Sequence, residues 1–207
     1  HDIEENVDTE VSAAECADNL DRMLRIEKEL RVDATYNMLG ILLARKRQII
    51  EASNPRHSIA FHSFNHSLND MTQLRQCRDV DLRVRGYRPP RSRITAELSD
   101  YNLTFWNFEW LASSVFSLGS EACRIENGLV KIPIAIDDYP LVTRAVDYQD
   151  WEPICSSARA RKSFSVSGYT IATPAFGWRG IRSCCTSLRR SAIRKRRSAV
   201  RLDVPYA

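Results

Sequence analysis

Several features are missing from this 207-residue sequence, and each absence narrows the classes of protein that it can encode. No apolar run approaches the length that a membrane span needs. The six cysteines show no Cys-x-x-Cys spacing, which favours reduced thiols over a disulfide framework. There is no internal repeat and no long Gly/Ser linker. A chain of this length is sufficient for one α/β domain with a sizeable core, and we expect one.

The start of the sequence also lacks two features. There is no initiator methionine, and the chain begins on the motif "HDIEE", so we expect that the natural N-terminus and most of a first strand are missing. No signal peptide is recognisable, and the expected location is cytoplasmic.

Acidic residues are almost absent from the last quarter of the chain. Residues 151–207 hold 12 of the 30 lysines and arginines but only two of the 26 acidic residues. The stretch "SLRRSAIRKRRSAVR" at 187–201 raises nucleic-acid binding as one class of function. Blocks of like charge are more often disordered tails, and no reader motif is recognisable. We therefore expect no specific nucleic-acid site from about Arg179 onward.

Histidine is scarce, yet three of the four histidines lie within "HSIAFHSFNH" at 57–66, and the fourth is His1. The run 58–61 predicts a buried strand, and His62 and His66 follow it four residues apart. If the chain turns helical there, both imidazoles lie on one face and could share a metal ion. An isolated pair with this spacing is more often two ordinary polar residues at a strand end. His57 precedes the strand and is interpreted as structural.

Two other stretches support a site. "HDIE" places Asp2 and Glu4 on the same side of an extended backbone. "RGYRPPRSR" at 85–93 holds Arg88 directly before two prolines, which stiffen the segment. All these groups follow predicted strands, and barrel enzymes carry their chemistry at the carboxyl ends of strands.

A coarse reading of periodicity and capping residues alternates strands with helices. We expect helices at 12–30 and 39–53, and strands at 32–38, 58–61, 82–88, 101–108 and 129–136. This alternation predicts a parallel sheet, closed as a barrel.

The motifs "HDIE", "HSFNH" and "RPPR", in this order over about residues 1–150, resemble those of the polysaccharide deacetylase family, also called the NodB homology domain or carbohydrate esterase family 4. The resemblance implies an α/β fold, a distorted (β/α) barrel, here incomplete at both ends. It would occupy residues 1–168, and 169–207 would form a basic, arginine-rich tail. The resemblance also implies hydrolysis of N-acetyl groups on N-acetylated sugars or polysaccharides.

The resemblance further implies which residues form a site. A divalent metal, often zinc, would be held by Glu4, His62 and His66. Asp2 would be the general base that takes a proton from the attacking water, and Arg88 would orient Asp2 and keep it ionised.

Two substrate contacts follow in the same way. A backbone N–H near Arg91 would stabilise the oxyanion, and Trp110 would wall the site. The sequence departs from the family pattern in three respects. Glu4 stands two places after Asp2 where an adjacent aspartate is usual, Arg91 replaces an aromatic residue, and no supporting aspartate occurs in 107–114.

The family's last motif is an aliphatic strand ending in a histidine that protonates the leaving amine, but no histidine follows His66. Codons can be written for 169–174 that, with one added nucleotide, read Leu-His-Asp-Cys-Tyr-Ala. We therefore hypothesise a frameshift near Gly168 and expect impaired activity of the chain as written. Three classes stay open: an amide hydrolase of N-acetyl sugars, a non-catalytic member of the same family, and a nucleic-acid-binding protein.

Overall fold

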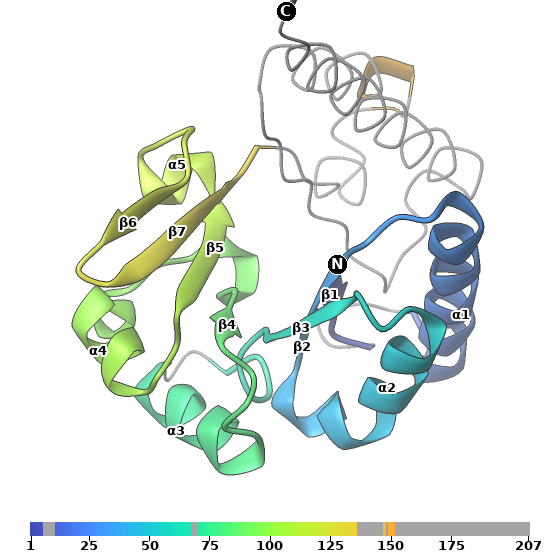
Figure 1. The fold of residues 1–207 in the computed structure, drawn as a ribbon, viewed down its shortest axis with the longest axis horizontal. Coiled ribbons are helices and arrows are strands. Elements are labelled where there is room, and N and C mark those ends of the chain that lie inside the picture. The colour runs from blue at the N-terminus through green and yellow to red at the C-terminus, as the bar shows by residue number, and fades with distance from the viewer. Residues whose placement is uncertain (6–10, 68–69, 136–146, 148, 152–207) are drawn as a thin grey trace, which may run out of the picture.

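The computed structural model describes residues 1–5, 11–67, 70–135, 147 and 149–151, and it contains one seven-stranded sheet (Figure 1). The strand order is β1-β2-β3-β4-β5-β7-β6, and every neighbouring pair is parallel except β6 with β7. The strands are β1 (Asp2–Ile3), β2 (Thr35–Met38), β3 (Ser58–Phe61), β4 (Gly86–Tyr87), β5 (Trp110–Ser114), β6 (Arg124–Glu126) and β7 (Leu129–Ile134). The predicted α/β class with a mainly parallel sheet is confirmed.

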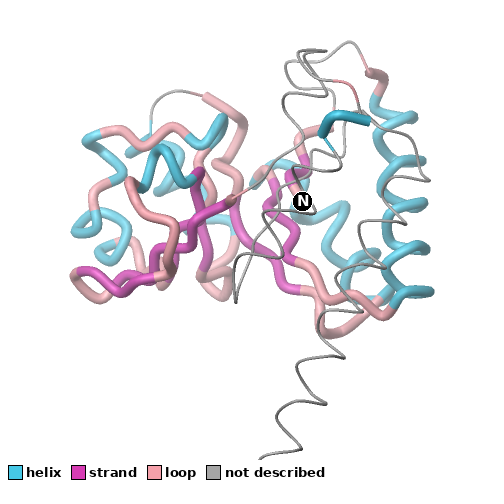
Figure 2. The backbone as a smooth tube through the Cα atoms, turned by 90° about the horizontal axis from the view of Figure 1, so that it is seen from above, coloured by secondary structure: helices cyan, strands magenta, loops and turns pink. Residues whose placement is uncertain are grey.

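Helices alternate with the strands along the chain. They are α1 (Ala13–Leu30), α2 (Gly40–Ser53), α3 (Asp70–Val80), α4 (Asp100–Phe105) and α5 (Val115–Leu118), with 3-10 turns at Pro90–Ser92 and Ala96–Leu98. Figures 1 and 2 show α1 and α2 flanking the β1–β3 part of the sheet. None of the helices in the described ranges has the length and apolar character of a membrane span.

One residue from each of the strands β1 to β5 lies at the same level of the sheet, and this level forms the centre of the hydrophobic core. Ile3, Met38, Phe61, Tyr87 and Leu111 are linked across the sheet by the strand register, and all are buried in one cluster. Since side chains alternate along a strand, residues one position before or after this level point to the opposite face. That opposite face carries the polar residues of the candidate site.

The two long predicted helices and strand 58–61 are confirmed. Helix α1 begins where the sequence predicts, because the Ser12 hydroxyl accepts a hydrogen bond from the Glu15 N–H. It ends at Arg31 in the left-handed conformation.

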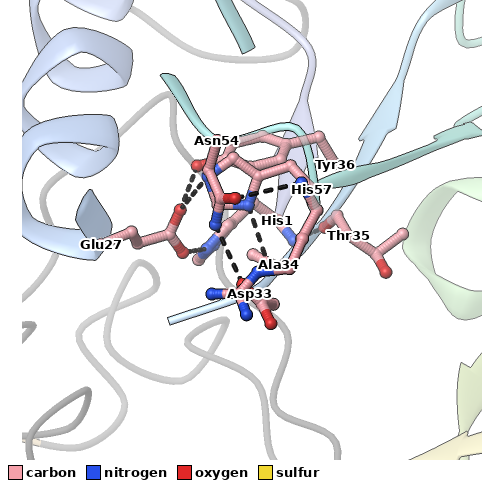
Figure 3. A network of polar contacts seen from close by, with 9 residues as sticks. His1, Glu27, Asp33, Ala34, Thr35, Tyr36, Asn54 and His57 are labelled. Atoms are coloured by element: carbon pink, nitrogen blue, oxygen red, sulfur yellow. Dashed lines mark hydrogen bonds and ion pairs between the residues drawn. The ribbon is translucent and has the colours of Figure 1, made fainter. Parts of the chain in front are cut away.

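Helix α1 is also held to the sheet by a buried polar network (Figure 3). Glu27, near the end of α1, accepts a hydrogen bond from the Tyr36 hydroxyl of β2, and its Oε1 lies 2.6 Å from His1 Nε2. His57, at the start of β3, places its Nε2 3.6 Å from Glu27 Oε2. Its Nδ1 accepts a hydrogen bond from the Ala34 N–H. His57 is therefore structural, as the sequence indicated.

Two strand predictions are corrected. Residues 101–108 were expected as a strand but belong mostly to α4, because Ser99 caps the helix by accepting a hydrogen bond from the Asn102 N–H. The strand expected at 82–88 is reduced to Gly86–Tyr87. The preceding turn is held by Arg78, whose guanidinium donates to the carbonyls of Asp81 and Val84.

The predicted boundary at residue 168 and the basic tail at 169–207 lie outside the described residues.

The strand expected at 129–136 is confirmed for Leu129–Ile134. The sheet begins at β1 and ends at β6, and the described residues contain no pairing between these two strands.

Candidate metal centre

Three residues of the site follow directly after three parallel strands. Glu4 comes after β1, His62 after β3 and Arg88 after β4, each one position beyond the central level of the core. The backbone N–H of Arg88 donates to the Phe61 carbonyl at 2.8 Å, which extends the pairing of β3 and β4 past their assigned ends. The carboxyl ends of these strands therefore meet, and the side chains that follow them meet too.

Glu4, His62 and His66 form a compact group of potential metal ligands. Glu4 Oε1 lies 2.6 Å from His62 Nε2 and 3.6 Å from His66 Nε2. One ligand atom from each residue can be chosen so that all three lie within 4.8 Å of one another. Burial raises the pKa of Glu4, but hydrogen bonds to both imidazoles and their charge outweigh burial and hold the pKa well below its ordinary value. Glu4 is therefore a carboxylate near neutral pH.

The tautomer of His62 provides a test of whether this group suits a metal. His62 Nδ1 lies 2.8 Å from the Arg88 carbonyl oxygen, which can only accept, so Nδ1 carries the proton. Without a proton, Nε2 would present a lone pair to the Glu4 carboxylate at 2.6 Å. Two lone pairs this close repel unless a cation or a proton lies between them. An Nδ1–H bonded to a carbonyl is also the arrangement of ligating histidines in metal sites, so these residues fit a divalent ion.

The segment from His62 to Ser67 is a turn and not the helix that would have aligned the two histidines. Ser63 and His66 both have φ values in the left-handed region, 65° and 67°. The Ser63 hydroxyl accepts the His66 N–H at 2.9 Å, and Asn65 Oδ1 accepts the Ser67 N–H at 3.2 Å. Ser63 and Asn65 thus shape the turn, and the turn brings His66 to Glu4 without helical spacing.

Asp2 and Arg88 form a buried ion pair beside these ligands. Arg88 Nε donates to Asp2 Oδ2 at 2.8 Å, and both side chains are buried. The other carboxylate oxygen, Asp2 Oδ1, accepts a hydrogen bond from Asn37 Nδ2 at 2.8 Å. Asn37 is the β2 partner of Asp2 in the strand register, so the two side chains share one face of the sheet. The expected role of Arg88 in orienting Asp2 agrees with this contact.

Comparisons with known proteins point to one fold. A Mycobacterium smegmatis protein named as a polysaccharide deacetylase matches with a TM-score of 0.61 and 15% identity, over 86% of this chain and 70% of that one. A family 4 carbohydrate esterase from Streptomyces lividans, in complex with acetate, matches with a TM-score of 0.56 and 12% identity, over 86% and 82%. A CE4 family pseudoenzyme from Bacillus anthracis matches with a TM-score of 0.52 and 13% identity, over 86% and 57%. The chain has the polysaccharide deacetylase fold.

No model of a protein family matches the sequence, and no curated protein matches it either. Identities of 12% to 15% to the solved structures describe a likeness of fold. What the deacetylase fold does in this chain is therefore argued from its own residues.

Trp110 is the first residue of β5 and lies on the same face of the sheet as Asp2. It pairs with Gly86, and the alternation of side chains places both residues on the face that carries the site. A Cβ at Gly86 would lie only 1.9 Å from the Trp110 ring, so the ring covers the glycine. The wall role of Trp110 stays a prediction that this placement supports.

Arg91 lies in the 3-10 turn Pro90–Ser92, and its side chain is exposed. Its φ of 53° results from the turn that follows Pro89 and Pro90. A contribution of its backbone N–H to an oxyanion site stays a prediction.

Sequence reasoning missed two residues of the site. Asn37 contacts Asp2, and its polar side chain in the otherwise buried strand "TYNM" was a signal that could have found it. Gln73 of α3 accepts hydrogen bonds from the turn between the two histidines, and no local pattern marks it.

Proposed function

We propose that this chain is a metal-dependent hydrolase of the polysaccharide deacetylase type, which removes N-acetyl groups from N-acetylated sugars or polysaccharides. The observation that carries the proposal is the compact group of Glu4, His62 and His66, in which Nδ1 of His62 donates to a carbonyl and Nε2 is left facing the other ligands. The fold that the chain shares with deacetylases makes the acetamido group the expected substrate. Zinc is the expected ion, because two imidazoles and a carboxylate are among its usual ligands.

A bound divalent ion would act as a Lewis acid that polarises the acyl carbonyl and acidifies water. Asp2 lies beside the ligand group and is the candidate general base for the attacking water. Arg88 and Asn37 each hold one oxygen of Asp2, so the carboxylate is fixed before substrate arrives.

The leaving amine needs a proton, and the sequence contains no histidine after His66 to supply it. Loss of general acid catalysis typically costs about a hundredfold to ten-thousandfold in rate. We therefore expect weak activity from the chain as written.

A second candidate is a non-catalytic protein that keeps the fold and binds the metal. The missing histidine favours it, and a protein of this fold from Bacillus anthracis is described as a pseudoenzyme.

The test is release of acetate from N-acetylated sugar oligomers, with and without added zinc, by the wild-type chain and by Asp2→Asn. The first candidate predicts slow, zinc-dependent release that Asp2→Asn abolishes. Zinc binding with no release would support the second candidate. Release that survives Asp2→Asn would contradict the role of the base.

A further inference from the structure

We propose that Gln73 is a positioning residue for the metal centre, which holds the turn between His62 and His66 so that His66 reaches Glu4. This inference rests on the proposed metal-dependent function, and it assigns a role to a residue on a different element, α3.

The contacts of Gln73 are directed at the backbone of the turn. Its side-chain oxygen accepts hydrogen bonds from the N–H groups of Phe64 and Asn65, both at 2.9 Å. The side chain is 2% exposed, so these bonds are shielded from water. The amide nitrogen donates to Gln76 Oε1 at 3.4 Å, one turn further along α3. Within the described part of the chain, the side-chain oxygen of Gln73 therefore bonds only to the turn between His62 and His66.

The opposite side of the turn is held by the start of α2. The N–H groups of Gly40 and Ile41 donate to the carbonyls of Ser63 and Phe64 at 3.0 and 3.1 Å. Helix starts have N–H groups without partners inside the helix, and here the turn provides them. A Cβ at Gly40 would lie 2.6 Å from the Phe64 ring, so the glycine permits this close approach.

The turn needs such support because its backbone is unfavourable. Ser63 and His66 both occupy the left-handed region, which residues with a Cβ adopt only when the surroundings impose it. Without Gln73, the N–H groups of Phe64 and Asn65 would be without their partner, and the turn could relax. His66 would then leave the 3.6 Å position beside Glu4, while His62 would remain on its strand end.

The chemistry of the contact provides a sharp choice of variants. Gln73→Met keeps the approximate size of the side chain but removes the acceptor. Gln73→Glu keeps an oxygen acceptor for both N–H groups, but it removes the amide donor and adds a negative charge. Gln76→Met removes the other partner of Gln73 and leaves the turn untouched, so it is the matched control.

The first experiment titrates the metal-free proteins with cobalt and records the visible absorption of the bound ion. Residues that support metal ligands typically contribute about ten- to a hundredfold to metal affinity. We expect Gln73→Met to weaken cobalt binding by that factor and to alter the spectrum. Gln76→Met should bind like the wild type, and Gln73→Glu, which keeps the acceptor, should bind more tightly than Gln73→Met. Equal affinity and spectrum for Gln73→Met and the wild type would overturn the proposal.

The second experiment uses the metal-free wild-type protein and needs no variant to fold. Amide hydrogen exchange should show strong protection of the Phe64 and Asn65 N–H groups. If the wild type bound no metal but these amides were protected, the proposed metal function would fail and the hold of Gln73 on the turn would stand. Exchange of both amides at the rate of a free loop would overturn the role of Gln73 itself.

Discussion

The four histidines form two pairs, each beside one glutamate carboxylate, and the tautomers separate their roles. Nδ1 of His62 donates to a carbonyl, so Nε2 is the ring nitrogen that can bind a metal. Nδ1 of His57 instead accepts the Ala34 N–H, so its Nε2 carries the proton and faces Glu27 as a donor. The first pair therefore suits ion binding, and the second suits hydrogen bonding to a carboxylate. This difference was not available from residue types and spacing.

The motif residues could be selected from the sequence, but their contacts could not. Asp2 and Arg88 are 86 positions apart, and their contact could be expected only from the family resemblance of three short motifs and from their shared place at the ends of predicted strands. Asn37 and Gln73 belong to no motif. Their roles depend on which strand and which helix lie beside the site, which local patterns do not encode.

Arg88 should be important for stability as well as for orientation, because it neutralises the buried Asp2 carboxylate. Replacing Arg88 by Met leaves that charge without its partner. We expect the free energy of unfolding to fall by about 3 kcal/mol, as for other buried pairs that lose one member. Urea unfolding of the metal-free protein measures this.

Arg91→Met is the matched control, since the Arg91 side chain is exposed. It should change the free energy of unfolding by about 0.5 kcal/mol or less. Equal losses in the two variants would contradict the pairing of Arg88 with Asp2.

At the scale of elements, predictions succeeded where local chemistry decides the structure. Helix α1 has its Ser12 cap, and strand 58–61 is a short apolar run. The prediction failed at 101–108, where spaced aromatic and aliphatic residues looked like a strand. The cap at Ser99 and the acid at Asp100 were the missed signals of a helix. The turn at 62–67 could not be predicted, because its conformation depends on contacts with α2 and α3.

The contact of α1 with the sheet should make the stability of the fold sensitive to acid. Burial raises the pKa of Glu27, but the charge of His1 and hydrogen bonds from His1 and Tyr36 outweigh it and lower the pKa overall. Burial lowers the pKa of His57, which outweighs the attraction of Glu27. Because both pKa values are lowered in the folded protein, Glu27 and His57 bind protons more readily in the unfolded chain. Stability should therefore fall as the pH drops below about 6.5, and further below about 4.5.

Urea midpoints of the metal-free protein at several pH values between about 7 and 4 measure this dependence. In His57→Gln the urea midpoint should decline less between pH values of about 7 and 5, because one group with a lowered pKa is gone. A wild-type urea midpoint that stays constant or rises on acidification would show that Glu27 and His57 do not have the expected charge states in the folded protein.

At the scale of the whole molecule, the shared deacetylase fold contrasts with the missing final motif. We propose that a frameshift near Gly168 accounts for the loss of that motif and for the excess of arginine after residue 151. Restoring one nucleotide there should produce a His-Asp pair. Acetate release from N-acetyl sugar oligomers should then rise by about a hundredfold to ten-thousandfold. Full activity from the unrepaired chain would refute the frameshift.

The basic tail should bind nucleic acid only through its charge. We expect weak, sequence-independent binding that falls steeply between about 50 and 200 mM salt. Fluorescence anisotropy with several unrelated DNA and RNA oligomers tests this. A sequence preference that persists at physiological salt would instead favour a nucleic-acid-binding function.

The central claim is that Glu4, His62 and His66 together hold one divalent ion. The most direct measurement is a zinc titration of the metal-free wild type by calorimetry, repeated with His66→Ala. We expect one ion per wild-type chain and much weaker binding by the variant, because one of three protein ligands is removed. Equal zinc affinity in the two proteins would contradict it.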